Sequence, residues 1–274
     1  MSDWAFTAGA YAKFSKAPTE PPVTHENGSL VNNTNENEYT IMIEWRFDQG
    51  RLNYFQIDEI KKISCALAAA DGMLKPVAGS DGLRKLLSMY TKLPFLPTDY
   101  TVWRNYGRVF GCMMLASEIG DHIVATDLCK KIASNPIEID ADDYLAHFSR
   151  HFYYSSPVFT GYSHTGKQIF PAVALIKFLI SEYLLRGKNY ITLEEIATHL
   201  IANEVTGQED LISFGNLKSN SIGSSADSRQ LRELVKFVSQ FSFLKWENPK
   251  LHLEVKDKEE LLAIENSLTP VIKT

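Results

Sequence analysis

From position 41 onward, apolar residues recur mostly at the three-to-four-residue spacing of amphipathic helices. In the first half of the chain this spacing predicts three helices, and a short stretch that bends at Gly120-Asp121 predicts a β-hairpin. Thr126 is then a suitable N-cap for a fourth helix. The predicted elements are helices at about 55–70, 81–91, 99–113 and 127–134, with a strand-turn-strand over 118–126. Helix, helix, longer helix and small hairpin is the order expected of a winged helix-turn-helix.

The second half repeats this order after an acidic stretch at 138–143, which we interpret as a solvated linker. Thr192 and Glu195 form a capping box, and Asn248-Pro249 lies at the bend of a second predicted hairpin. The predicted helices span about 144–152, 170–185, 192–203, 227–241 and 258–266, and the hairpin joins 243–246 to 251–255. We therefore expect a mainly α fold with small β-hairpins, organised as tandem winged helix-turn-helix modules at 41–135 and 141–274.

Residues 1–40 have a different composition, with a few aromatic residues followed by prolines and an asparagine-rich tract. Such a tract cannot bury enough apolar surface to offset the entropy of ordering it, so we expect a flexible N-terminal arm. The longest near-apolar run, 169–185, is interrupted by Pro171, Lys177 and Glu182, which argues against a membrane span. The start of the chain has no secretory signal, and three widely spaced cysteines favour a cytoplasmic protein with reduced thiols.

The overall charge limits the function classes. The chain has 28 Lys+Arg against 33 Asp+Glu, a formal net charge of −5. This balance excludes a basic field over the whole protein, so any nucleic-acid binding must come from local cationic patches.

Sequence motifs for catalysis are largely missing. The chain contains no GxxxxGK[ST], GxGxxG, HExxH, CxxC or GxSxG string. His147 and His151 have the i,i+4 spacing of a metal-binding pair, but two further ligands at suitable spacing are not evident. The aspartates at 140, 142 and 143 are assigned to the solvated linker for a similar reason. We predict no metal site and no cofactor.

One string resembles part of a nuclease site. Restriction nucleases of the PD-(D/E)xK kind place an acid and a lysine two residues apart, where they hold a divalent ion and the attacking water. Glu254 and Lys256 have this spacing, which makes them weak catalytic candidates. Alternation along a strand explains the same pattern, with both side chains facing solvent. The alternative function is therefore a divalent-metal-dependent restriction endonuclease that would require Mg²⁺.

Non-covalent DNA recognition has more support from the residues. The third helix of a winged helix enters the major groove, where Arg can bind guanine and Asn or Gln can bind adenine. The predicted outward faces of the third helices carry Trp103, Arg104, Asn105 and Arg108 in the first module, and Arg229, Gln230, Arg232 and Lys236 in the second. The predicted inward faces carry Tyr106, Val109, Phe110 and Met113, and Leu231, Leu234, Val235 and Val238. Lys61, Lys62, Arg84 and Lys85 could add contacts to phosphates.

Three stretches of sequence resemble the DNA-reading half of AlwI-like and related restriction endonucleases. They are Trp103–Ala133, the discontinuous stretch 142–201 and Ser228–Val255, and the resemblance covers about residues 51–256. In those enzymes tandem winged helices precede a nuclease domain of PD-(D/E)xK or HNH type. The resemblance implies double-stranded DNA as the partner and a prokaryotic restriction or antiviral-defence context.

The chain departs from that family about twenty residues after the second predicted hairpin, where the enzymes continue into a nuclease domain. We therefore expect a sequence- or modification-specific DNA-binding module, working with a nuclease or another defence subunit. The endonuclease using Glu254 and Lys256 is one alternative. A protein-binding winged-helix scaffold within a multi-subunit complex is another, and the negative net charge would suit it.

Overall fold

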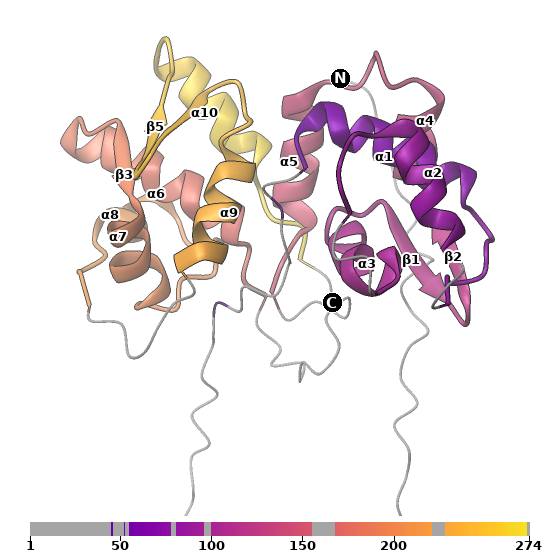
Figure 1. Ribbon diagram of the computed structural model, residues 1–274. Coiled ribbons are helices and arrows are strands. Elements are labelled where there is room, and N and C mark those ends of the chain that lie inside the picture. Colours follow the sequence, from indigo (N-terminus) through magenta and orange to yellow (C-terminus); the bar gives the residue numbers. More distant parts are fainter. Residues whose placement is uncertain are drawn as a thin grey trace, which may run out of the picture. The chain divides into compact units, whose positions relative to one another are not determined.

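The structure is a computed structural model that describes residues 45, 52, 55–77, 81–95, 100–154, 168–220 and 228–272. Contacts group residues 41–274 into one compact unit, apart from 1–40. The predicted N-terminal arm lies outside the described residues. Helices predominate, and the strands form small antiparallel sheets, as predicted for a mainly α fold (Figure 1). The division into modules at 41–135 and 141–274 stays a prediction.

The elements of the first half follow the predicted order. They are α1 (Ile57–Ala69), α2 (Gly82–Tyr90), α3 (Val102–Cys112), β1 (Ala116–Ile119), β2 (His122–Ala125) and α4 (Asp127–Ser134). Helix α5 (Ala141–His151), predicted as the first helix of the second half, comes next. Side-chain caps fix several of the starts, because an oxygen of the capping residue accepts the backbone N–H three residues on. Thr126 caps α4 in this way, as predicted. Thr101 caps α3, so this helix begins at Val102 rather than near residue 99.

The second half has more elements than were predicted. They are α6 (Pro171–Arg186), β3 (Tyr190–Thr192), α7 (Leu193–Glu195), the π-helical turn η2 (Ile196–Ile201), α8 (Leu211–Gly215), α9 (Ser228–Val238), β4 (Leu244–Glu247), β5 (Lys250–Leu253) and α10 (Lys258–Ser267). The capping box of Thr192 and Glu195 is present. The helix that it opens continues as a π turn, and α8 was not predicted.

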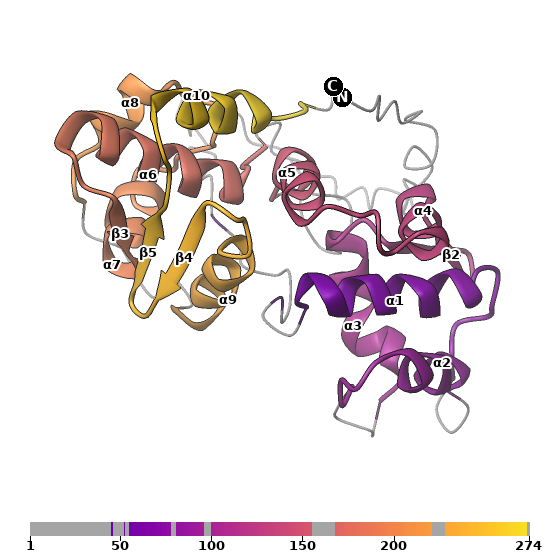
Figure 2. The same cartoon turned by 90° about the horizontal axis from the view of Figure 1, so that it is seen from above.

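The second half contains a strand, and the first half a bridged segment, that the hydrophobic pattern did not reveal. In the first half, Ile123 of β2 donates its N–H to Met73 O at 2.8 Å and accepts from Gly72 N at 2.8 Å, and Leu74 bridges His122. In the second half, β3 pairs with β5 to give the order β3-β5-β4. Both halves therefore place a segment that follows a helix, α1 or α6, beside the last strand of the hairpin, and Figure 2 shows β3, β5 and β4 next to α6 and α9.

The core of each half forms around an apolar helix or helix face. Residues 171–182 of α6 are all buried, including Lys177 and Glu182, and α6 contacts the sheet and α8. In the first half, α1 packs on α2 and α4. Helix α5 contacts residues of both halves: the Tyr144 hydroxyl donates to Met113 O at 3.2 Å, and the rings of Phe148 and Phe237 lie 4.9 Å apart.

The acidic stretch before α5 is more ordered than a solvated linker. Asp140 caps α5 by accepting the N–H of Asp143 at 3.0 Å. Asp142 accepts the N–H of Ser242 at 2.8 Å and its hydroxyl as well. Asp140 and Asp142 thus have defined partners, at the start of α5 and one hundred positions away, while the interpretation of this stretch as a boundary between modules stays a prediction. Within the described residues, no helix is long and apolar enough to cross a membrane.

Candidate nucleic-acid interface

Helix α3 presents two arginines to solvent on one face. Arg104 and Arg108 are exposed, and they are one helical turn apart. The Arg104 guanidinium carbon lies 3.8 Å from the centroid of the Tyr100 ring, which supports the side chain from beneath. The residues predicted to face inward, Tyr106, Val109, Phe110 and Met113, are buried. The predicted amphipathic orientation of α3 is confirmed.

The corner between α2 and α3 is fixed by one carboxylate and one guanidinium. Asp81 accepts the N–H of Arg84 at 2.9 Å and the N–H of Val102 at 2.7 Å, so it caps α2 and holds the start of α3. The Arg84 guanidinium donates to the carbonyls of Phe95 and Tyr100, which lie in the connection between the helices. Arg84 was predicted as a phosphate contact, but these guanidinium N–H groups bind the connection between α2 and α3.

The α2–α3 segment has a charge opposite to that of the chain. Residues 81–112 contain five Lys and Arg against two Asp, a net of +3, whereas the whole chain has −5. Lys85 and Lys92 are exposed together with Arg104 and Arg108. A concentrated positive charge on an acidic chain is the electrostatic signature of an anion-binding surface.

Helix α9 repeats the arrangement. Arg229, Arg232 and Lys236 are exposed at i, i+3 and i+7, which places them on one face. The acid of this helix, Glu233, is 8% exposed, and its Oε1 lies 3.9 Å from Arg229 Nε. Gln230 is half-buried. The residues predicted to face inward, Leu231, Leu234, Val235 and Val238, are buried.

Trp103 and Asn105 lie at the flanks of the exposed face of α3, and both are half-buried. The indole N–H of Trp103 donates to Glu118 Oε2 of β1 at 2.8 Å. Its ring packs at 6.3 Å from the ring of Phe110. The indole N–H of Trp103 is thus occupied within the protein. Its acceptor, Glu118, is visible in the sequence as an acid in the predicted hairpin, but the spacing of the two residues does not show that they meet.

The two hairpins differ in charge. Exposed Glu118 and Asp121 in the first hairpin lie 3.4 and 3.8 Å from Lys75 Nζ. In the second hairpin, Lys245 pairs with Glu247 at 2.7 Å, and the Lys250 ammonium lies 4.2 Å from the centroid of the Tyr190 ring. Cation–π contact and the cross-strand register keep Lys250 on the outer face of the sheet, next to Thr192 and Glu247.

The weak catalytic candidates lie beyond the end of β5. Glu254 and Lys256 are exposed, while Leu253 is buried and Val255 is half-buried. The backbone N–H of Lys256 donates to Glu260 Oε2 at 2.7 Å, so this segment leads into α10. Within the described part of the chain, no group of three or more His, Cys, Asp or Glu residues could hold a metal ion.

The histidine pair predicted on a helix lies on α5. The rings of His147 and His151 stack at 4.2 Å, and the Nδ1 of His151 lies 2.8 Å from His147 O. One ring nitrogen of His151 is therefore engaged with the backbone of its own helix.

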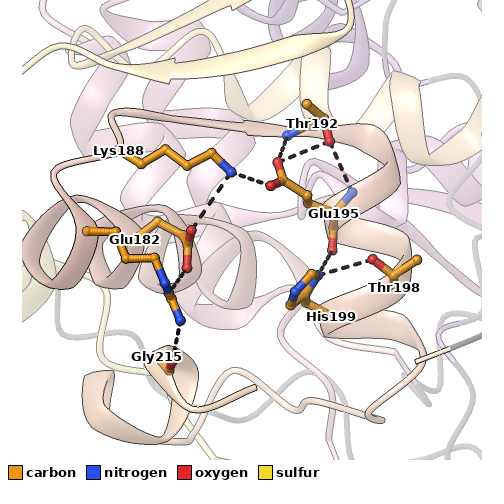
Figure 3. Close-up of polar contacts among 8 residues, drawn as sticks. Glu182, Lys188, Thr192, Glu195, Thr198, His199 and Gly215 are labelled. Atoms are coloured by element: carbon orange, nitrogen blue, oxygen red, sulfur yellow. Dashed lines mark hydrogen bonds and ion pairs between the residues drawn. The ribbon is translucent and has the colours of Figure 1, made fainter. Parts of the chain in front are cut away.

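A partly buried charge network connects elements of the second half (Figure 3). The Glu182 carboxylate of α6 accepts from Arg186 and lies 3.8 Å from Lys188 Nζ, which also donates to Glu195. Arg186 donates to Gly215 O at 3.0 Å, and His199 Nδ1 lies 3.1 Å from Glu195 O. The network joins α6, β3, α7 and α8, and α7 in turn contacts α9.

Two carboxylates, one in each half, have pKa values below their ordinary values. Burial raises the pKa of Glu195, but hydrogen bonds from Lys188 and from the Thr192 N–H outweigh it and leave that pKa below 4.5. In the first half, the hydrogen bond from Lys130 holds the pKa of Asp71 below 3.8, helped by the Ala125 N–H. Both acids therefore stay ionised and hydrogen-bonded at neutral pH.

Comparisons with known proteins add one structural likeness. No protein-family model matches this chain, and no curated protein matches it. Among solved structures, a similar chain is the BpuJ1 endonuclease binding domain, determined in complex with pyrene- and phenanthrene-modified DNA. The two chains are 11% identical and align with a TM-score of 0.48, over 68% of this chain and 72% of the other.

Proposed function

We propose that this chain is a sequence- or modification-specific module that binds double-stranded DNA. Two winged helix-turn-helix units, at 41–135 and 141–274, would present α3 and α9 to the major groove. The observation that supports this most directly is the pair of cationic helix faces, Arg104 with Arg108 and Arg229 with Arg232 and Lys236, on a chain of net charge −5.

The topology of each half supports the winged-helix part of the proposal. In the second half, the short strand β3 follows α6 and pairs with β5, the last strand of the hairpin. In the first half, the segment 72–75 follows α1 and makes backbone hydrogen bonds with β2 without forming a strand of its own. This arrangement leaves the last helix before the hairpin with its apolar side in the core and its polar side exposed. An α-helix of that kind fits the width of the major groove, where arginine binds guanine through two hydrogen bonds.

The cellular context rests on the sequence resemblance to restriction endonucleases. We propose that the chain works in a prokaryotic restriction or antiviral-defence system, beside a nuclease or another defence subunit. In this role it selects the DNA and needs no cofactor of its own.

A salt titration of duplex binding tests the proposal. Duplexes enriched by the protein from a random pool would supply the best site, and its Kd would be measured between about 50 and 200 mM salt. Each phosphate contact contributes roughly 0.9 to the slope of log K against log salt. We expect the double variant Arg104→Ala/Arg108→Ala to lose both affinity and slope. Lys218→Ala, which removes an exposed cation outside α3 and α9, is the matched control and should bind like the parent.

The opposite outcome would point to another class of protein. If the parent binds no duplex, or binds with a slope near zero, the cationic faces serve protein contacts. The scaffold alternative would then replace the DNA-binding proposal.

A further inference from the structure

Helix α3 and the first hairpin are joined by one side-chain hydrogen bond. The indole N–H of Trp103 donates to Glu118 Oε2 at 2.8 Å, and the same oxygen lies 3.4 Å from Lys75 Nζ. Lys75 is itself held by the hairpin, because its backbone N–H donates to Asp121 O at 2.7 Å. Glu118 therefore connects α3, β1 and the bridged segment that follows α1.

The sequence of α3 makes room for this contact. A Cβ atom at Gly107 would lie 3.0 Å from two carbons of the Trp103 indole, so the absence of a side chain lets the ring lie along the helix. The ring also packs on Phe110 one turn further on. Trp103, Gly107 and Phe110 form a stripe that borders the stripe of Arg104 and Arg108, one residue on. Fixing the indole therefore fixes the direction in which the arginines project.

The negative charge of Glu118 is unfavourable for DNA binding at this position. Its side chain is 48% exposed, close to a surface that we propose for binding phosphates. A carboxylate at such a place repels DNA and weakens binding of every sequence alike. The hydrogen bond from Trp103 of α3 gives this carboxylate a structural role that offsets the repulsion.

We infer that Glu118 is a positioning residue that sets sequence preference by orienting α3 through Trp103. The inference rests on the proposed function, and it concerns preference between sequences rather than affinity. Without the hydrogen bond, α3 can rotate or tilt, and the bidentate contacts of Arg104 and Arg108 with base edges lose their geometry while their charge remains.

Two substitutions at one position separate positioning from charge. Glu118→Gln removes the negative charge and keeps an oxygen that accepts the indole N–H, whereas Glu118→Ala removes both. If charge alone matters, both variants bind all duplexes more tightly and by the same factor. If Glu118 positions α3, Glu118→Gln keeps the ratio of Kd values between the best site and a scrambled duplex within about twofold. Glu118→Ala should reduce that ratio about tenfold, within the range set by one base contact.

Further variants isolate the hydrogen bond. Trp103→Phe keeps an aromatic ring on Gly107 and Phe110 but removes the donor, so it should match Glu118→Ala, and the double variant should lose no more than either single one. Lys75→Ala is the control, because it removes the ion pair and leaves the hydrogen bond. It should keep the preference of the parent.

An NMR measurement reports the contact without DNA. The indole N–H signal of Trp103, assigned by its loss in Trp103→Phe, should move upfield in Glu118→Ala and stay near its position in Glu118→Gln. Equal preference ratios in the Gln and Ala variants, or an unmoved indole signal in Glu118→Ala, would overturn the inference while the parent still binds DNA. If the parent binds no duplex, the proposed function fails first and the inference fails with it.

Discussion

The two candidate recognition helices lie beside hairpins of different chemistry. The hairpin next to α3 exposes Glu118 and Asp121, and its one nearby cation, among the residues that the structure describes there, is Lys75. The hairpin after α9 exposes Lys245 and carries Lys250 over the Tyr190 ring. Similar element orders thus distribute positive charge differently: in the first half it is concentrated on the helices, and in the second it extends onto the sheet.

This difference suggests unequal roles in DNA binding. A hairpin with two carboxylates is repelled by phosphates, so the first half would contact DNA mainly through α3. A hairpin with lysines can follow the backbone beside the groove that α9 enters. We therefore expect the second half to supply more of the salt-dependent affinity, and the first half more of the sequence preference.

Removing a core ring should have the largest effect and would test whether the halves are separate modules. Phe110 and Phe237 are fully buried, and Phe→Ala in a core costs about 3–5 kcal/mol of unfolding free energy. If the halves are modules, Phe110→Ala should lower the urea midpoint of the first half and leave amide protection in α9 unchanged. A single cooperative transition, shifted equally for both halves, would show that residues 41–274 unfold as one unit.

Single base-reading arginines should have the next largest effect. Arg104→Ala or Arg232→Ala should each cost about 1–3 kcal/mol of binding free energy and relax the preference at one base pair. Lys236→Ala, a presumed phosphate contact, should weaken all sequences about equally and lower the salt slope by about one. Gel-shift titrations on cognate and scrambled duplexes would measure both effects. If all three variants bind like the parent, α3 and α9 do not read DNA.

Acid should destabilise both halves through one carboxylate each. The folded-state pKa values of Asp71 and Glu195 lie below their ordinary values of 3.8 and 4.5, so their contribution to stability is fully present above those values. It is lost as the pH falls through the lower folded-state pKa of each group. Asp71→Asn and Glu195→Gln should be less stable than the parent at pH 7 and lose less stability between pH 5 and pH 3. Urea unfolding at several pH values would measure this, and parallel pH profiles of parent and variants would contradict it.

The hairpins offer a smaller and more direct test of the comparison. Lys250→Ala should reduce the salt slope by up to about 0.9, the value for one phosphate contact. Asp121→Ala, which removes a carboxylate from the first hairpin, should leave the slope unchanged and tighten binding about twofold at low salt. The comparison breaks if both hairpins respond to charge removal in the same direction.

Substitution of Glu254 should have the smallest effect, whereas the endonuclease alternative predicts a large loss of DNA cleavage. If Glu254 and Lys256 only follow the second hairpin, Glu254→Ala should leave DNA cleavage by any larger assembly within a few-fold of the parent. Removing a metal ligand would instead reduce cleavage about 100-fold or more with DNA binding intact. Cleavage of a supercoiled plasmid with Mg²⁺ and the partner nuclease would distinguish these outcomes.

Local rules account for the parts that were predicted from the sequence. The inward faces of α3 and α9 follow from helical periodicity, Thr126 and the capping box at Thr192 follow from cap chemistry, and the hairpin bends follow from Gly120 and Pro249. Each of these depends on residues within about four positions, and such patterns are visible in a sequence.

The missed features depend on distant partners. The segment at 72–75, which forms a β-bridge with β2, is too short to show an alternating pattern, and its hydrogen bonds come from residues some fifty positions later. The bond from Trp103 to Glu118 and the bonds from Ser242 to Asp142 are likewise set by packing. A tryptophan on an outward helix face was interpreted as a DNA contact because its internal acceptor could not be identified from spacing.

The carboxylate of Asp81 has a consequence for how such a module can diversify. Because it binds the N–H groups of both Arg84 and Val102, the N-terminal ends of α2 and α3 are joined directly. The carbonyls of Phe95 and Tyr100 are joined to the same corner through Arg84, so we expect changes of length to be tolerated between these two residues rather than throughout the connection. Sequence changes there would leave the start of α3 in place.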